Sequence, residues 1–227
     1  MKIAIYGDSY FDATHGHNDP TLEKYGWVNL LKEHYDVIIF GKVASGVYYS
    51  YKKFLDTHND FDRIIFGVTI SSRWGHGFDV NGKERHFNNL TATKNFLDTN
   101  LNQYPDHLIK QIKALNDYYN YLLDSEHTNI MKNLMVDEVK RIRPDVIIMD
   151  IDHDPISYYR ELQKKYFGIS KEYPLEIRCI CHFTKEFNQA LYRNVLNKLT
   201  TGDWGELETN INVLEDFSYY FSNSKNI

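Results

Sequence analysis

The stretch Lys2-Ile3-Ala4-Ile5-Tyr6-Gly7-Asp8-Ser9 decides the fold of this chain. Its short apolar run with branched residues predicts a buried β-strand rather than a helix. Gly7 permits a sharp turn directly after the strand, and Asp8 and Ser9 are favoured at the start of a helix. We therefore expect Ser9 on a strand-to-helix turn, near backbone N–H groups that can stabilise an oxyanion. The alternative is that Asp8 or Ser9 merely caps the following helix.

Further strands and helices alternate along the chain. Apolar runs at 37–40, 63–69 and 145–150 predict buried strands, and apolar periodicity predicts helices over 26–34, 47–58, 105–123, 125–142, 155–167 and 184–199. This alternation predicts an α/β fold, with a parallel sheet covered by helices on both faces in three layers, as in flavodoxin-like proteins. Ligands of such sheets bind beyond the carboxyl ends of the strands, where Ser9, Gly46 and Thr69 fall.

The 227 residues fit one substantial domain with elaborations. We expect a single α/β domain over residues 1–200, with a helical insertion after the third strand at about 75–143. Residues 201–227 are predicted to be a C-terminal extension. Substrate choice is expected to depend on the insertion, because long connections often carry specificity.

Composition excludes several classes of function. The net charge of −5, with scattered basic residues, argues against a nucleic-acid partner. No apolar run approaches the ~18 residues of a membrane span, and no secretory signal is evident, so we expect no membrane partner and a cytoplasmic location. The 18 tyrosines and many asparagines are typical of an AT-rich genome, such as that of a phage, for which the host cytoplasm or the virion is expected.

Metal and cofactor sites are not expected. His15 and His17 lie in a polar stretch without a third ligand of defined spacing, so we interpret this stretch as a surface loop. Cys179 and Cys181 are too few for a metal site and poorly spaced for a disulfide, which predicts reduced thiols. The acidic residues at 150–154 are interpreted as a solvated strand end.

Three blocks, in this order and spacing, together resemble the SGNH (GDSL-type) hydrolase family. They are Gly7-Asp8-Ser9 near the N-terminus, Gly46 after the second strand, and His182 just before the last helix. Gly26-Trp27 before an apolar helix and residues 181–188 are also similar to family segments. The resemblance covers roughly residues 1–74 and 144–200.

The resemblance implies a catalytic arrangement. It implies that Ser9 is a nucleophile and His182 its general base, with oxyanion donors from the backbone N–H groups of Ser9 and Gly46. Asp8 is implied to flank the nucleophile and shape its turn. The expected reaction is hydrolysis of a small-molecule or carbohydrate ester, such as an O-acetyl group, without a cofactor.

Two positions depart from the family pattern. Thr69 stands where an asparagine normally supplies a third oxyanion donor, and Cys179 stands where the triad acid is expected. A threonine hydroxyl can still donate, so Thr69 is kept as an oxyanion candidate. The candidates for the third triad member are Glu176, Asp152 and Asp154, unless the site works as a Ser–His pair. Arg73 and Trp74 are expected either to contact substrate or to cover the end of the sheet.

Two other functions compete with hydrolysis. Thr69 and Cys179 suit a catalytically weak or silent binding or structural protein on the same fold. A flavodoxin-like nucleotide binder is disfavoured, because Gly7-Asp8-Ser9 lacks a glycine-rich phosphate loop with a lysine.

Overall fold

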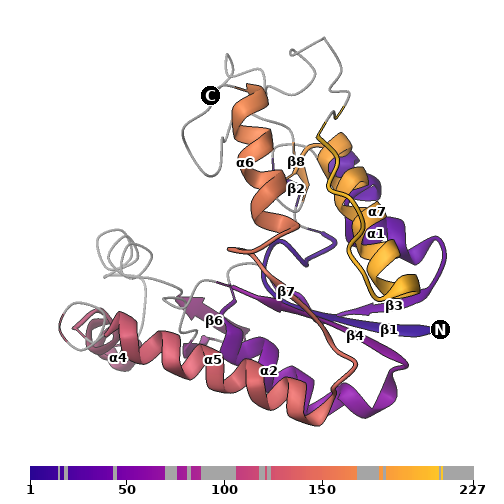
Figure 1. Cartoon of the computed structure of the whole chain (residues 1–227). Helices are drawn as coiled ribbons and strands as arrows, with labels where there is room; N and C mark the ends of the chain where they lie inside the picture. The colour runs from indigo at the N-terminus through magenta and orange to yellow at the C-terminus, as the bar shows by residue number, and fades with distance from the viewer. Residues whose placement is uncertain are drawn as a thin grey trace.

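Four parallel strands form the central sheet, in the order β3-β1-β4-β7 (Figure 1). The strands are β1 (Lys2–Tyr6), β3 (Asp36–Ile39), β4 (Arg63–Val68) and β7 (Ile147–Asp150). The computed structural model describes residues 1–14, 16–17, 20–42, 45–69, 76–80, 83–87, 106–117, 121, 124–167, 179–180, 183–209 and 211. All four predicted strands are present and mutually parallel, which confirms the α/β fold.

Helices cover both faces of the sheet (Figure 1). Helices α1 (Trp27–Lys32), α6 (Ile156–Phe167) and α7 (Lys185–Thr201) lie on one face, and α2 (Val47–Thr57) and α5 (Ser125–Ile142) lie on the other. Successive β1 side chains alternate between the two cores: Ile3 and Ile5 pack with the first group of helices, and Ala4 and Tyr6 with the second. The predicted three-layer arrangement follows from this alternation.

Smaller elements connect these layers. They are β2 (Gly16–His17), η1 (Pro20–Tyr25), η2 (His58–Asp60), β5 (His76–Val80), β6 (Lys83–Phe87), α4 (Asp106–Asp117) and β8 (Cys179–Ile180). Strands β5 and β6 form an antiparallel pair, as do β2 and β8. The segment predicted as an insertion includes α5, whose Met135 and Val139 are buried in the core beside the sheet. This part of the segment is therefore integral to the α/β layers.

The described part of the predicted C-terminal extension packs on the body. Ile211 is buried in the same core as α6 and α7, and Trp204 packs against it. The Asn194 side-chain amide of α7 donates to the carbonyls of Trp204 (2.7 Å) and Glu206 (3.1 Å). The hydroxyl of Tyr159 on α6 donates to Asn194 Oδ1 (2.5 Å), so the same network links both helices to this segment.

One local prediction is wrong: strand β3 was expected to be buried, but it lies at an edge of the sheet and Ile38 is 37% exposed. Thr184 occupies the N-cap position of α7, but its side chain makes no cap bond there. Its hydroxyl donates to Glu186 Oε2 (3.2 Å) instead, while its backbone N–H donates to Gln163 Oε1 (2.9 Å).

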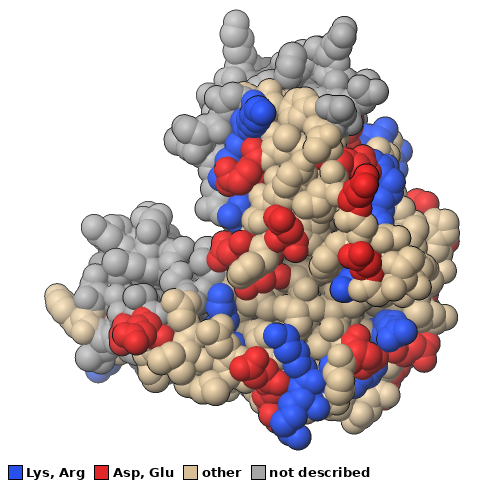
Figure 2. Space-filling model, viewed as in Figure 1, with Lys and Arg blue, Asp and Glu red and all other residues tan. Residues whose placement is uncertain are grey.

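Charged residues are interspersed over the face shown in Figure 2. Acidic side chains gather near the middle of this face. In the sequence, Asp150 ends β7, and Asp152 and Asp154 lie in the loop before α6. None of the described helices combines the length and apolarity needed to cross a lipid bilayer.

Candidate active site

Gly7, Asp8 and Ser9 follow β1 directly, at the carboxyl end of a central strand. Residues 8–14 form bends and turns, beginning with a hydrogen bond from the Phe11 N–H to the Asp8 carbonyl (3.0 Å). The next predicted helix, α1, has Gly26 as its N-cap, so the alternative that Asp8 or Ser9 caps that helix is wrong. Ser9 is 4% exposed, so this turn is built into the body.

Asp8 is fully buried and holds the turn through both carboxylate oxygens. Its Oδ1 accepts from the Tyr10 N–H (3.1 Å), two residues along the chain. Its Oδ2 accepts from the hydroxyl of Thr69 (2.7 Å), which directly follows β4. The Thr69 hydroxyl proton is thus directed at Asp8, and the predicted oxyanion role would require it to leave that bond.

Phe11 fixes the same turn from the other side. Its ring is fully buried and lies against Gly7, which follows β1, and Gly67, the last residue but one of β4. A Cβ atom at Gly7 would lie 2.3 Å from Phe11 Cδ2, and one at Gly67 would lie 2.4 Å from Cε2. No side chain larger than hydrogen fits at either position. The sequence analysis missed Phe11, although the two glycines at the strand ends were the available signal.

The loop after β3 is tied to the turn at Gly7. The Gly7 carbonyl accepts from the Ser45 hydroxyl (3.0 Å) and from the Lys42 N–H (3.1 Å). Ser45 is followed by Gly46, the buried N-cap residue of α2, where no side chain caps the helix. The positive end of the α2 dipole therefore lies beside the Ser9 turn, which suits a developing negative charge.

A buried bridge joins the Ser9 turn to the start of α7. The Trp27 indole N–H donates to the Tyr10 carbonyl (2.9 Å), and the Trp27 backbone N–H donates to Asn188 Oδ1 (3.0 Å). The Asn188 side-chain amide donates to the carbonyls of Phe183 (2.9 Å) and Thr184 (3.1 Å). Trp27 and Asn188 are both fully buried. Sequence analysis identified Trp27 as part of a family-like segment but did not assign Asn188 a role.

Two further contacts join the same segments. The rings of Tyr10 and Phe183 meet edge to face, with centroids 5.7 Å apart. Strands β2 and β8 pair antiparallel, with Gly16 opposite Ile180. The chain on both sides of position 182 is thereby held against the chain that follows Ser9. His182 itself, Glu176, Arg73 and Trp74 lie outside the described residues.

The two described candidates for the third triad member each have another partner. Asp152 Oδ1 lies 3.6 Å from an Arg160 guanidinium nitrogen, and Asp154 Oδ1 accepts from the Ser157 hydroxyl (3.0 Å). Both aspartates are exposed. Their contacts fit anchoring of the loop between β7 and α6.

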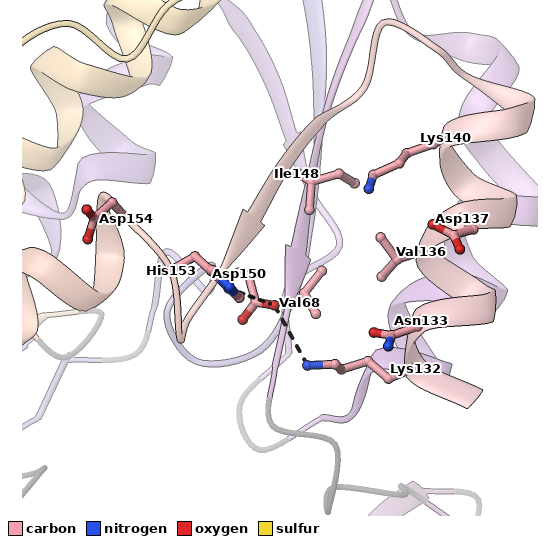
Figure 3. A pocket seen from close by; sticks show the side chains of 10 residues that line it. All are labelled: Val68, Lys132, Asn133, Val136, Asp137, Lys140, Ile148, Asp150, His153 and Asp154. Atoms are coloured by element: carbon pink, nitrogen blue, oxygen red, sulfur yellow. Dashed lines mark ion pairs between the residues drawn. The ribbon is translucent and has the colours of Figure 1, made fainter. Parts of the chain in front are cut away.

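A pocket opens beside this loop, between α5 and β7 (Figure 3). We call it the α5–β7 pocket; its volume is about 460 Å³. It is lined by Val68, Lys132, Asn133, Val136, Asp137, Lys140, Ile148, Asp150, His153 and Asp154. The Lys132 side chain was missed because its helix was predicted to belong to the insertion. Among the described residues, no group of three or more histidine, cysteine or acidic side chains is placed to hold a metal ion.

Comparisons with known proteins give weak likenesses. No protein-family model matches the chain, and no curated protein matches its sequence. Among solved structures, the acetyl xylan esterase AlAXEase is similar with a TM-score of 0.39 and 14% identity, over 88% of this chain and 100% of that chain. A protein of the lipolytic G-D-S-L family from Desulfitobacterium hafniense DCB-2 gives a TM-score of 0.28 and 12% identity, over 66% and 77% of the two chains.

Proposed function

We propose that this protein is an SGNH-type serine hydrolase that cleaves an ester, with Ser9 as the nucleophile and His182 as the general base. The observation that carries the proposal is the buried Trp27–Asn188 bridge. The bridge joins Tyr10, the residue after Ser9, to Phe183, the residue after His182. Two segments far apart in sequence are thus held together, which supports a contact between Ser9 and His182 as nucleophile and base.

The proposed reaction follows from these roles. His182 takes the Ser9 hydroxyl proton as Ser9 Oγ attacks the acyl carbon. The backbone N–H groups of Ser9 and Gly46 hold the oxyanion, supported by the N-terminus of α2. Collapse of the tetrahedral intermediate expels the alcohol, which takes its proton from His182. Water then attacks the acyl-enzyme by the same steps and releases the acid.

The proposal treats Ser9 and His182 as a catalytic pair. Asp152 and Asp154 are each engaged by another residue, and Cys179 replaces the expected acid. Glu176 remains the proposed candidate for a third member. Arg73 and Trp74 remain proposed substrate contacts. The substrate is proposed to be a small-molecule or carbohydrate ester. The proposed reaction requires no cofactor.

Hydrolysis of p-nitrophenyl acetate tests the proposal. Wild type is expected to hydrolyse it, Ser9→Ala to fall to background, and His182→Ala to lose about 10²- to 10⁴-fold in kcat. Ser157→Ala and His127→Ala, which alter a serine and an exposed histidine outside the proposed site, are matched controls expected to keep full activity. The proposal fails if wild type is no faster than Ser9→Ala.

A catalytically silent binding or structural protein is the alternative function. It is favoured by the Thr69 hydroxyl, which donates to Asp8 (2.7 Å) where the family would offer an oxyanion donor. This alternative predicts no turnover by wild type with any ester. Turnover that is abolished by His182→Ala would exclude it.

A further inference from the structure

The α5–β7 pocket is lined by charged side chains of both signs, and the least exposed of them lie close to an opposite charge. Lys132 Nζ lies 3.7 Å from Asp150 Oδ2, and both side chains are mostly buried, at 16% and 17% exposure. His153 Nδ1 lies 3.4 Å from the same carboxylate oxygen. Lys140 and Asp137 bring one further charge of each sign to the lining. The third aspartate, Asp154, is exposed and accepts from the Ser157 hydroxyl (3.0 Å). The aspartates would repel an anion in the pocket and the lysines would repel a cation, so the lining favours a neutral ligand.

The Lys132–Asp150 pair can share one hydroxyl group of a ligand. At 3.7 Å the ammonium and the carboxylate are beyond direct hydrogen-bond distance. A hydroxyl oxygen placed beside the pair, about 2.8 Å from both atoms, can accept from Lys132 and donate to Asp150 at once. Figure 3 shows Lys132 reaching from α5 toward Asp150 on β7, whereas Asp154 lies apart, beyond His153.

The pocket also has an apolar surface. Val68, Val136 and Ile148 line it between the polar groups, from β4, α5 and β7. A polyhydroxylated ring, with hydroxyl groups at its edge and C–H groups on its face, matches this combination of polar and apolar lining. The volume of about 460 Å³ lies in the range of small-molecule sites.

The pocket adjoins the proposed catalytic turn. Val68 lines the pocket, and the next residue, Thr69, donates to Asp8 beside Ser9 (2.7 Å). One peptide step of about 3.8 Å between Cα atoms therefore separates the pocket lining from the hydrogen bond that holds the turn. A ligand in the pocket lies at the same carboxyl end of the sheet as Ser9.

We propose that the α5–β7 pocket binds a neutral sugar ring, with a ring hydroxyl bridging Lys132 and Asp150. The identification of this sugar as the alcohol part of the ester substrate rests on the proposed function. The preference of the pocket for a neutral polyhydroxylated ring does not.

Sugars without an ester group test the pocket apart from catalysis. Xylose, glucose and galactose are titrated into the full-length protein and followed by NMR chemical shifts, with glucuronate and glucosamine as charged counterparts. At least one neutral sugar is expected to bind more tightly than either charged sugar and to shift resonances of α5 and β7. Ser9→Ala is expected to bind it equally well.

Variants locate the binding site. Lys132→Ala and Asp150→Asn are each expected to weaken sugar binding by about tenfold or more, the value of one good polar contact. Arg141→Gln removes a charge from the same helix at a side chain that is 71% exposed and outside the pocket, so it should bind as wild type does. Asn133→Ala, at an exposed lining residue, supplies a second weakened variant if the buried pair proves necessary for folding.

The outcomes separate the two proposals. Sugar binding that depends on Lys132, in a protein without esterase activity, supports the pocket and contradicts the proposed function. Esterase activity without binding of any neutral sugar contradicts the pocket alone. Tighter binding of a charged sugar, or equal weakening by Arg141→Gln, would also overturn the inference.

Discussion

At the scale of single residues, Asp8 and Thr69 fix the geometry of the turn that carries Ser9. The Asp8 carboxylate is fully buried and accepts from Thr69 on the neighbouring strand end and from Tyr10 in its own turn. The position of Thr69 beside the turn could be predicted from its place after a strand. Its partner could not, because a hydroxyl suits an oxyanion and a carboxylate equally well in sequence. The hydroxyl here acts as a support for Asp8.

Thr69→Val tests this role. Val keeps the shape but removes the donor to a buried carboxylate, so we expect the free energy of unfolding to fall by about 1.5–3 kcal/mol. Thr69→Ser keeps the hydroxyl and loses one methyl group, so it should cost only about 1 kcal/mol. Urea denaturation of both variants measures the difference. An oxyanion donor would instead give a 10²- to 10³-fold loss of kcat in Thr69→Val with stability unchanged, and that result would contradict a supporting role.

Phe11 shows what the sequence alone conceals at this scale. Gly7 was predicted to permit a turn, and it does follow β1 directly. Its more specific requirement is the ring of Phe11, which also excludes a Cβ atom at Gly67. Two glycines sixty residues apart share one aromatic partner only once the strands are paired. Local sequence patterns do not predict which distant strands pair, so they could not predict this shared contact.

At the scale of elements, the positions of strands and helices along the chain were predicted better than their burial in the fold. The four strands and the helices α2, α5, α6 and α7 follow their apolar patterns closely. Burial of β3 was predicted wrongly, because a run of branched residues looks the same at the edge of a sheet as at its centre. After Ser9, residues 10–14 form turns within the stretch that was interpreted as a loop, and Asp8 holds their start through its bonds to Tyr10 and Thr69.

The Trp27–Asn188 bridge gives a prediction about elements. Asn188→Leu keeps the approximate volume but leaves the Trp27 backbone N–H and the Phe183 carbonyl buried without this partner. At about 1–3 kcal/mol for each group, the free energy of unfolding is expected to fall by about 2–6 kcal/mol. Trp27→Phe loses the single indole bond to Tyr10 and should cost less.

The control for the bridge is a second asparagine on α7. Asn197 makes an exposed bond to the Asp203 carbonyl, so Asn197→Leu should change the free energy of unfolding by less than about 1 kcal/mol. Chemical denaturation compares the three variants at one pH. Equal losses of unfolding free energy for Asn188→Leu and Asn197→Leu would show that the bridge between α1 and α7 does not stabilise the fold.

At the scale of the whole molecule, two tyrosines make the stability of the fold depend on pH in the alkaline range. Burial raises the pKa of Tyr6, between the sheet and α2, to about 12, and burial also raises the pKa of Tyr159 on α6 to about 12. In the unfolded chain a tyrosine ionises near pH 10. Above that pH the unfolded state releases protons that the folded state retains, so stability falls as pH rises.

Denaturation at increasing pH measures this effect. The free energy of unfolding contributed by these groups should be present in full below about pH 10 and decline from there toward about pH 12. Tyr6→Phe and Tyr159→Phe remove the titrating hydroxyl and should each make the decline shallower. An unchanged decline in both variants would show that other groups cause it.

Mapping of covalent labelling by a fluorophosphonate is the most direct test of the central claim, that Ser9 is a nucleophile activated by His182. The expected result is one adduct, located by peptide mass spectrometry on Ser9, absent in Ser9→Ala and strongly slowed in His182→Ala. Labelling of His127→Ala should match wild type. No adduct on wild-type Ser9, or labelling that proceeds equally fast without His182, would contradict the claim.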